Sequence, residues 1–468
     1  MPLRLAVRDI TFFERPVPFA RPFRFGAVTI SASTQLFVRV EIEVEGSGRA
    51  VGVTAEMLAA KWFDKRPHLT PEQTVDELRR SLAIARELYL SNPDLDTAFG
   101  LHARCIGAHV AACAAEDIPP LVAALGPAEI DKAILDAALR SAGVSFFDGM
   151  AANIAGVDAR LSPDLDDIAV SRFLAAREPL GRVAIRHTVG MDDRIEGEGG
   201  VADLRENAGA RYFKLKLNGD PAHDAARLAR IGKELATLAY PVKVTLDANE
   251  QYADLATLKA LVDQLDHDAT LAPIAANLLY IEQPMPREVT KASPLGALSA
   301  RSFIIDEADD SYDAFPAARA LGYRGISSKS CKGIYKSIIN AARAAVWSAA
   351  GDSYFISGED LTCQTGLAVQ QDLALGALIG VTHAERNGHH YVDGFAETPA
   401  DEADAFLAAH PDLYRRDGAK VRLAIHDGDL LTGSIAAAPG FASSVHPDWS
   451  AMQPLKRPTS RLLQEQTL

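Results

Sequence analysis

The first fifty residues alternate between hydrophobic and polar side chains, which is the pattern of half-buried strands. Residues 35–45 are the clearest case, since they read Gln-Leu-Phe-Val-Arg-Val-Glu-Ile-Glu-Val-Glu. Gly46 and Gly48 supply a turn, and a second apolar run follows at 50–53. The pattern predicts a small antiparallel sheet.

A helical period replaces this alternation from about residue 70. Thr70 is a suitable N-cap, Pro71 suits the first helical position and Gln73 completes a capping box, so we expect a helix that runs to about residue 88. Two more segments with helical spacing of apolar residues lie near 97–115 and 120–142. The sheet and these helices together predict an α+β unit.

Short β-rich runs recur beyond residue 182, and helical stretches such as 225–238, 255–265 and 337–347 separate them. The eight runs are 183–187, 212–217, 242–247, 278–282, 303–307, 325–329, 354–359 and 380–385. Eight strands that alternate with helices favour a parallel (β/α)8 barrel of the TIM type over an open doubly wound sheet. No glycine fingerprint for phosphate follows the first run, which weakens a dinucleotide-binding alternative.

These patterns divide the chain into three parts. We expect an α+β capping domain over residues 1–128 and a (β/α)8 barrel over 129–394. The remaining segment, 395–468, is richer in Asp, Gly and Pro, and we expect it to pack back on the capping domain. The predicted fold class is α/β, a TIM-type barrel with an α+β capping domain.

Composition excludes several classes of protein. Hydrophobic residues make up 48% of the 468 residues and charged residues 24%, which is an ordinary globular balance. The net charge of −14, with no basic run, argues against a nucleic-acid partner. Charges near the N-terminus argue against an export signal, and no apolar stretch has the roughly 20 residues that a membrane span needs. The four cysteines have no paired spacing, so we expect reduced, mostly buried thiols in a cytoplasmic protein.

Two lysines share one face of the second predicted barrel strand. Lys214 and Lys216 alternate with Phe213, Leu215 and Leu217, whose apolar side chains need a covering helix. In a barrel, the lysines on the other face point inward. They are therefore candidates for chemistry rather than for a solvated strand edge.

Acidic residues end the next three predicted strands. Asp247, Glu282 and Asp306 each stand at a carboxyl-terminal strand end, where TIM-barrel active sites are assembled. Three inward carboxylates repel one another unless a cation holds them, and oxygen ligands of this kind suit Mg²⁺. Glu307 competes with Asp306 for the third position, because the two side chains point to opposite faces of their strand.

Lys329 closes the sixth predicted strand, across the barrel from the second. Lysines on opposite sides of one metal ion suit proton transfer at the carbon next to a carboxylate. One amine takes the proton, the other can return one, and the metal stabilises the enediolate.

These residues form a recognisable series of motifs, and the chain resembles the enolase superfamily, most closely its muconate-lactonizing and dipeptide-epimerase branch. The motifs are Lys214-Leu-Lys216, Asp247-Ala-Asn249, Glu282-Gln-Pro284, Asp306-Glu307-Ala308 and Lys329-Ser-Cys-Lys332. Residues 133–143 resemble the helix that leads into the family's barrel, and Phe23-Arg-Phe-Gly26 resembles its substrate-covering loop.

The resemblance implies a role for each of these side chains. Lys216 and Lys329 become the acid/base pair, and Lys214 faces the substrate carboxylate. Asp247, Glu282 and Asp306 bind one Mg²⁺, for which Mn²⁺ is a possible substitute. Asn249 is a candidate for substrate binding. Glu385 on the eighth strand is another candidate from its position, and a structural ion pair with Arg386 or another basic residue is the equal alternative.

The chain also departs from the family pattern. Residues 268–276 look inserted before the fourth strand. Only Gly333 stands where the family usually shows two glycines, so the register of the sixth strand is less secure and Lys332 is the fallback for the second base. The eighth strand lacks the Asp-x-Asp of dipeptide epimerases, which argues against a dipeptide substrate. The seventh strand closes with Glu359 and Asp360, so it lacks the histidine of mandelate racemase relatives.

We therefore predict a Mg²⁺-dependent enzyme that abstracts a proton α to a carboxylate through an enediolate. A racemase or epimerase follows most simply from two bases on opposite faces. Syn β-elimination or cycloisomerisation is the alternative, with one lysine acting electrostatically. A non-catalytic binding barrel is less favoured, because the principal charged positions are all present. The expected partner is a small-molecule carboxylate, without nucleic acid or membrane, and we expect a homo-oligomer.

Overall fold

The computed structural model describes residues 2–26, 28–361 and 363–458. Its N-terminal part is an antiparallel sheet of β1 (Leu5–Phe25), β2 (Val28–Val44) and β3 (Gly48–Met57), with β2 in the middle. The predicted turn lies between β2 and β3, and positive φ angles of 73° at Gly46 and 83° at Gly48 explain why glycine stands there. The predicted antiparallel sheet is confirmed.

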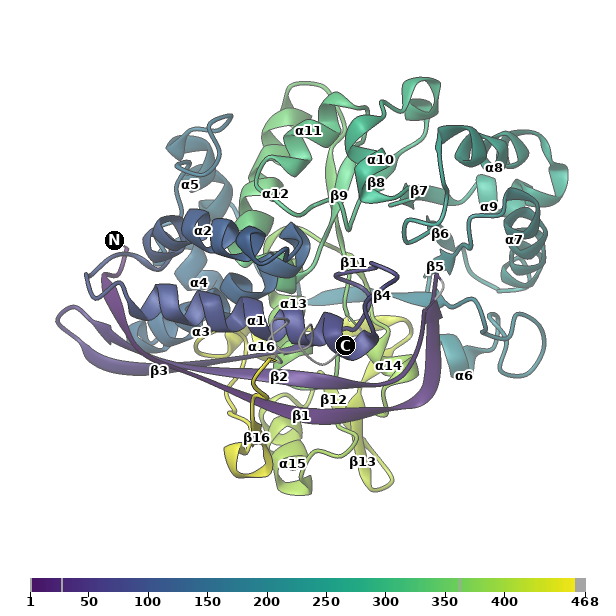
Figure 1. The fold of residues 1–468 in the computed structure, drawn as a ribbon. Coiled ribbons are helices and arrows are strands. Elements are labelled where there is room, and N and C mark those ends of the chain that lie inside the picture. The colour runs from purple at the N-terminus through teal and green to yellow at the C-terminus, as the bar shows by residue number, and fades with distance from the viewer. Residues whose placement is uncertain (1, 27, 362, 459–468) are drawn as a thin grey trace, which may run out of the picture.

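The predicted helices follow the sheet as α1 (Pro71–Leu90), α2 (Ala98–Ala115) and α3 (Pro120–Ala142). The Thr70 hydroxyl accepts from Gln73 N–H and the Gln73 side chain accepts from Thr70 N–H, so the capping box is present. Helix α3 contacts the cap sheet through β2 and β3 and the barrel through the 3₁₀ turn η3 (Ser330–Lys332), and it is buried along most of its length (Figure 1). It therefore lies where cap and barrel meet.

Eight parallel strands form the closed barrel predicted from the sequence (Figure 1). They are β4 (Arg182–Val189), β5 (Tyr212–Lys216), β6 (Lys243–Asp247), β7 (Leu278–Glu282), β8 (Phe303–Ile305), β9 (Gly325–Ser328), β10 (Phe355–Gly358) and β11 (His383–Glu385). Each strand pairs with the next in the chain, and β11 pairs with β4 to close the ring. The carboxyl ends of all eight strands consequently meet at one mouth.

Helices cover the outside of this barrel. The longer ones are α7 (Pro221–Leu235), α8 (Leu255–His267), α12 (Ile334–Ala349) and α13 (Leu367–Leu378). The shorter ones are α4 (Phe146–Ala151), α5 (Asp167–Ala175), α6 (Leu204–Asn207), α10 (Arg287–Ala292), η2 (Gly296–Ala300) and α11 (Ala314–Ala320). Residues 268–276, which look inserted in the sequence, form η1 (Ala269–Leu271) and α9 (Ala272–Ala275), and both pack on α7.

The chain after the barrel returns to both earlier parts. Beyond α14 (Gly388–Tyr391) and α15 (Ala400–Ala409) it forms the hairpin β12 (Tyr414–Asp417) and β13 (Lys420–Leu423). Strands β14 (Ile425–His426) and β15 (Asp429–Leu431) follow, and β15 pairs antiparallel with β4. After α16 (Gly433–Ala437) and η4 (Trp449–Ala451), β16 (Gln453–Pro454) pairs with β1.

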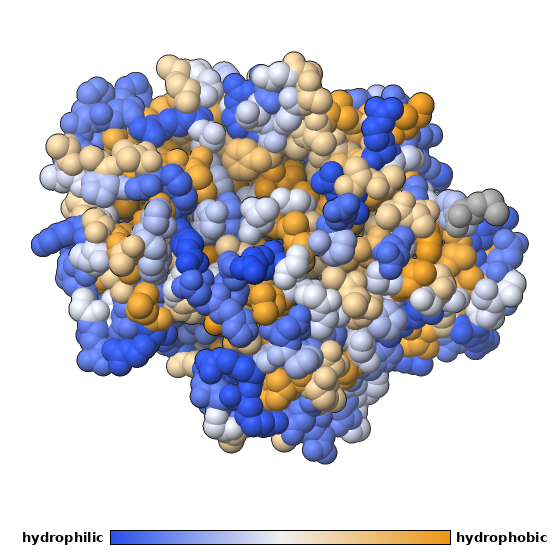
Figure 2. All heavy atoms as spheres, turned by 180° about the vertical axis from the view of Figure 1, so that it is seen from behind, coloured by the Kyte–Doolittle hydropathy of each residue, from blue (hydrophilic) through white to orange (hydrophobic). Residues whose placement is uncertain are grey.

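The surface, the cysteines and the helices are those of an ordinary globular protein. The face seen in Figure 2 is a mosaic of hydrophilic and hydrophobic residues. All four cysteines are buried and free. None of the helices in the described residues has the length and apolar character needed to cross a membrane.

Candidate active site

The two lysines of β5 lie inside the barrel. Phe213 and Leu215, on the other face of the strand, are fully buried in the hydrophobic core. Lys214 and Lys216 are only 1% and 4% exposed, so their ammonium groups lie away from bulk water. Buried ammonium groups need anionic partners, and the neighbouring strands supply them.

Lys214 is shared by four carboxylates. Its Nζ lies 2.8 Å from Asp247 Oδ2, 3.0 Å from Glu282 Oε2 and 3.1 Å from Glu385 Oε2, and it also contacts Glu359. Burial alone would lower the pKa of Lys214, but the four carboxylates outweigh burial and raise that pKa well above its ordinary value. Lys214 is therefore a fixed positive charge at the centre of the barrel mouth.

Lys216 has a different set of contacts. Its Nζ lies 2.5 Å from Asp247 Oδ2 and donates to Asn249 Oδ1 at 2.8 Å. Asn249 N–H donates to Asp247 Oδ1 at 2.9 Å, and the asparagine adopts a φ of 45°, a left-handed conformation that Asn tolerates better than most residues. This turn holds both oxygen-bearing side chains against the lysine.

Lys329 lies on the opposite side of the barrel mouth. Its Nζ is 2.8 Å from Asp306 Oδ2 and 4.6 Å from the centre of the Trp62 ring, which comes from the cap. Burial opposes the charge of Lys329, but Asp306 and Glu359 raise its pKa. Lys332 contacts the other oxygen of Asp306 at 3.1 Å and donates to the Ser327 carbonyl, so it lies behind Asp306.

A narrow cavity joins these residues. Its lower wall contains Lys214, Lys216, Lys329, Asp247, Asn249, Asp306, Asp360, Leu361, Glu385 and Asn387, whereas Lys332 does not line it. Cap residues Phe23, Phe25, Ile30, Ala59 and Trp62 form the apolar cover. The cavity holds about 30 Å³. That volume suits about one water molecule, so a substrate enters only if the cap segments move.

Sequence reasoning missed the partner of Glu359. Arg186 of β4 contacts Glu359 and donates to Ser357 Oγ at 3.0 Å and to the Gly358 carbonyl at 2.7 Å. Burial and two neighbouring carboxylates, Glu282 and Glu385, raise the pKa of Glu359 well above its ordinary value. The signal was the alternation in β4, where Arg186 follows Ala184 on the face opposite Val183 and Ile185.

Glu307 and Asp306 have separate environments, as the alternation predicts. Asp306 accepts from Lys329 and Lys332, whereas Glu307 Oε1 lies 2.6 Å from Lys65 Nζ of the cap. Lys65 also lies 2.7 Å from Glu250 Oε2 and donates to the Asn249 carbonyl at 3.0 Å. Lys65 was not singled out in the sequence, because no local pattern shows that a cap residue reaches the barrel mouth.

Glu385 faces the site rather than its neighbour in the sequence. It contacts Lys214 and accepts from Thr188 Oγ1 at 2.6 Å, whereas Arg386 turns away to Asp360 and Asp372. Burial opposes its charge, but Lys214, the hydrogen bond with Glu359 and the more distant lysines together outweigh burial and lower the pKa of Glu385 well below its ordinary value. Glu385 is therefore an ionised group that lines the cavity.

The predicted metal ligands have the right chemistry but are held by lysines. In the described residues, no three His, Cys, Asp or Glu side chains are gathered around one ion position. Within the same residues Glu282 Oε1 has no hydrogen-bond partner, and Glu282 Oε2 is held only by the ion pair with Lys214. Burial, together with Asp247 and Asp306, raises the pKa of Glu282 to about 7. Glu282 is thus the under-compensated carboxylate of the three, and its oxygen atoms are the type of ligand that suits a hard divalent cation.

The fold has many relatives among solved structures. An enolase from Bradyrhizobium, complexed with magnesium and mandelic acid, is 16% identical with a TM-score of 0.61, over 96% of this chain and 98% of that one. A mandelate racemase/muconate lactonizing protein from Herpetosiphon aurantiacus is 18% identical with a TM-score of 0.58, over 92% of this chain and 97% of that one. An enolase from Pseudomonas fluorescens Pf0-1, with bound magnesium, potassium and tartrate, is 14% identical with a TM-score of 0.58. The match covers 96% of this chain and 91% of that one.

No protein-family model matches the chain, and no curated protein matches it. The structural relatives nevertheless extend over nearly the whole chain, cap and barrel together. The chain has the fold of the mandelate racemase/muconate lactonizing members of the enolase superfamily.

Proposed function

We propose that this protein is a Mg²⁺-dependent enzyme of the enolase superfamily that removes a proton α to a carboxylate. The observation that carries the proposal is the placement of Lys216 and Lys329 at the ends of β5 and β9, four strands apart in a ring of eight. Both line one cavity, with Asp247 and Asp306 beside them. A substrate between the two lysines presents one face to each.

Asp247, Glu282 and Asp306 would hold the metal ion. When bound there, a divalent cation stabilises the negative charge of an enediolate and lowers the pKa of neighbouring ammonium groups. Solved relatives with this fold contain magnesium with mandelic acid or with tartrate, both of them 2-hydroxycarboxylates. The proposed partner is accordingly a small-molecule carboxylate.

Residues of the protein itself transfer the proton, bind the substrate carboxylate and exclude water. Lys216 removes or returns the α-proton on one face of the substrate, and Lys329 does so on the other. Lys214 supplies a fixed positive charge for the substrate carboxylate, while Asn249 and Glu385 provide hydrogen-bonding groups in the cavity wall. The apolar cover of Phe23, Phe25 and Trp62 excludes water from the reacting carbon.

Racemisation or epimerisation is the reaction we favour, since two bases face one cavity. Syn β-elimination or cycloisomerisation is the second candidate, and one observation favours it. Lys329 is held by Asp306 and covered by the Trp62 ring, and its pKa is raised. An ammonium group fixed in this way is suited to an electrostatic role as well as to proton transfer.

A screen of small 2-hydroxy and 2-amino carboxylates in D₂O tests the proposal. Proton NMR should show loss of an α-proton signal for at least one compound with the Mg²⁺-loaded protein, and no loss after chelation. Lys216→Ala should remove the exchange of at least one enantiomer, whereas Lys243→Ala, at the exposed start of β6, should keep all of it. Exchange of the α-proton that is unchanged by chelation of Mg²⁺ and by Lys216→Ala would contradict the proposal.

A further inference from the structure

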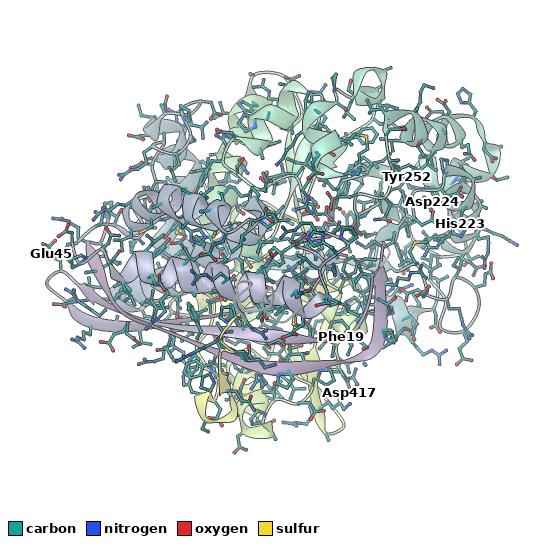
Figure 3. The ribbon with its side chains drawn as sticks, viewed as in Figure 1. Phe19, Glu45, His223, Asp224, Tyr252 and Asp417 are labelled. Atoms are coloured by element: carbon teal, nitrogen blue, oxygen red, sulfur yellow. The ribbon has the colours of Figure 1, made fainter. Side chains whose placement is uncertain are left out.

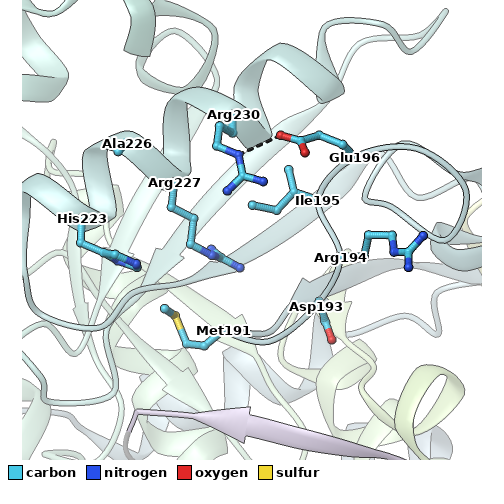
Figure 4. A pocket seen from close by; sticks show the side chains of 9 residues that line it. All are labelled: Met191, Asp193, Arg194, Ile195, Glu196, His223, Ala226, Arg227 and Arg230. Carbon is cyan, nitrogen blue, oxygen red and sulfur yellow. Dashed lines mark hydrogen bonds and ion pairs between the residues drawn. The ribbon is translucent and has the colours of Figure 1, made fainter.

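A second pocket lies outside the barrel, between α7 and the loop of residues 190–203 that follows β4 (Figure 4). It has a volume of about 550 Å³ and is open on one side to solvent. Its walls combine basic groups with apolar ones, among them Arg194, Arg227, Arg230, Met191 and Ile195. None of these residues lines the cavity of the candidate active site.

Arg227 is the central basic group of this pocket. It is only 6% exposed, yet within the described ranges no carboxylate lies at ion-pair distance from its guanidinium group. Its hydrogen bonds go to main-chain carbonyls, at 2.6 Å to Gly190 and 3.0 Å to Lys216. Burial lowers its pKa, although Asp193 and Asp224 act in the opposite direction. A guanidinium group keeps its charge in proteins, so Arg227 is a buried cation without an acidic partner.

The acidic groups in and near the pocket have partners other than Arg227. Asp193 accepts from Tyr391 Oη at 2.6 Å and from Gly190 N–H at 2.8 Å, and Glu196 pairs with Arg230 at 2.8 Å. Asp224, next to His223 on α7 (Figure 3), accepts from Tyr252 Oη at 2.7 Å and does not line the pocket. Three arginines against two acids leave one positive charge in the pocket.

Figure 4 shows the guanidinium group of Arg227 pointing from α7 towards the loop, with Met191 and Ile195 on either side. Arg194, on the same loop, has no carboxylate at ion-pair distance among the described residues and donates to the Glu198 carbonyl at 3.1 Å. One uncompensated positive charge beside an apolar surface matches a singly charged organic group better than a dianion.

We propose that this pocket binds a small organic carboxylate, whose carboxylate group pairs with Arg227 and whose apolar body rests on Met191 and Ile195, while Arg194 adds positive charge at the pocket wall. The proposal is independent of the function proposed for the barrel mouth. The proposed ligand would lie beside two segments that extend to the barrel mouth. Arg227 holds the carbonyl of Lys216, and Met191 N–H donates to the carbonyl of Arg24 in the cap hairpin at 3.4 Å.

Calorimetric titration with sodium benzoate, at low ionic strength and neutral pH, tests the proposal, with acetate and neutral benzamide as comparison ligands. Benzoate should bind more tightly than acetate, and benzamide should not bind. Ala226→Glu places a carboxylate on the pocket wall at an exposed helical position. This variant should lower the affinity for benzoate by about tenfold or more. Arg227→Gln should do the same, and Arg194→Gln should weaken binding by about threefold.

Two controls separate this pocket from other sites. Arg205→Gln removes an exposed arginine outside the pocket and should leave affinity unchanged. Lys329→Met alters the barrel mouth. Benzoate binding that Ala226→Glu weakens should keep its affinity in the Lys329→Met variant. If Arg227→Gln fails to fold, Ala226→Glu decides the question. Absence of benzoate binding, or binding that Ala226→Glu leaves intact, would overturn the proposal.

Discussion

Two buried lysines of this protein, Lys132 and Lys214, both lie among carboxylates, but only one of them lines a cavity that could admit a ligand. Lys132 of α3 lies 2.8 Å from Glu129 Oε1 and 3.3 Å from Glu56 Oε2, and all three side chains are almost completely buried. Lys214 of β5 is equally buried and is also surrounded by carboxylates. None of the residues of the Lys132 cluster lines the cavity at the barrel mouth, whereas Lys214 does.

The comparison teaches that burial and shifted pKa values do not identify an active site by themselves. Burial raises the pKa of Glu129 to about 8, and burial also raises the pKa of Glu282 at the barrel mouth, to about 7. The Lys132 cluster joins α3 to β3, so it serves the contact between helix and sheet. A cavity that can admit a ligand is the feature that distinguishes the Lys214 cluster.

The largest expected effect comes from removing either lysine. Lys132→Met and Lys214→Met should each destabilise the protein by about 3–5 kcal/mol in EDTA. Lys132→Met leaves the buried Glu56 without its cation, and Lys214→Met does the same to Asp247 and Glu385. Mg²⁺ should restore part of the stability of Lys214→Met, since the barrel mouth can take up a cation in place of the ammonium group. Urea unfolding with and without Mg²⁺ measures both. Equal behaviour of the two variants towards Mg²⁺ would remove the distinction.

The pH dependence of the Lys132 cluster gives the next effect. Because the pKa of Glu129 is raised from 4.5 to about 8, its contribution to stability is present below about pH 4.5 and is lost as the pH rises through about 8. Glu129→Gln should therefore be more stable than the unaltered protein above pH 8, by up to roughly 5 kcal/mol, and the difference should vanish towards pH 4.5. Thermal unfolding across this range tests it, with the exposed Glu288→Gln as control.

The identity of the third metal ligand gives a smaller effect. With Mg²⁺ at 100 times its Kd, binding should stabilise the unaltered protein by about 2.7 kcal/mol. Asp306→Asn should abolish that stabilisation, and Glu307→Gln should keep most of it, because Glu307 pairs with Lys65 instead. The reverse result would make Glu307 the ligand.

The smallest effect concerns the contact of the cap loop with the barrel. Lys65→Met removes the ammonium group that joins Glu250 and Glu307, and it should cost about 1–2 kcal/mol of stability. Hydrogen exchange should rise in residues 58–69. Lys61→Met is the matched control, because the ammonium group of Lys61 donates to the Arg66 carbonyl within the loop. An increase in both variants would show that the loop, rather than the bridge, is responsible.

Much of the fold followed from the sequence, because each barrel strand carries its own local signal. The alternation around Lys214 and the acids at successive strand ends placed the main polar residues at one mouth, where the structure also has them. The Arg186–Glu359 and Lys65–Glu307 pairs were not foreseen, since their members are far apart in the chain. Such pairs depend on tertiary contacts that local patterns do not record. The division at residues 128 and 394, the homo-oligomer and the ligand roles stay predictions.

Enantiomer-specific exchange in D₂O tests the central claim most directly. With a chiral carboxylate that the protein exchanges, Lys216→Ala should abolish exchange of the α-proton of one enantiomer and Lys329→Ala that of the other, because each variant keeps the base on its own face. Lys332→Ala should keep exchange of both. Equal loss for both enantiomers in both lysine variants would contradict two-base proton transfer, and loss in Lys332→Ala but not in Lys329→Ala would move the second base to Lys332.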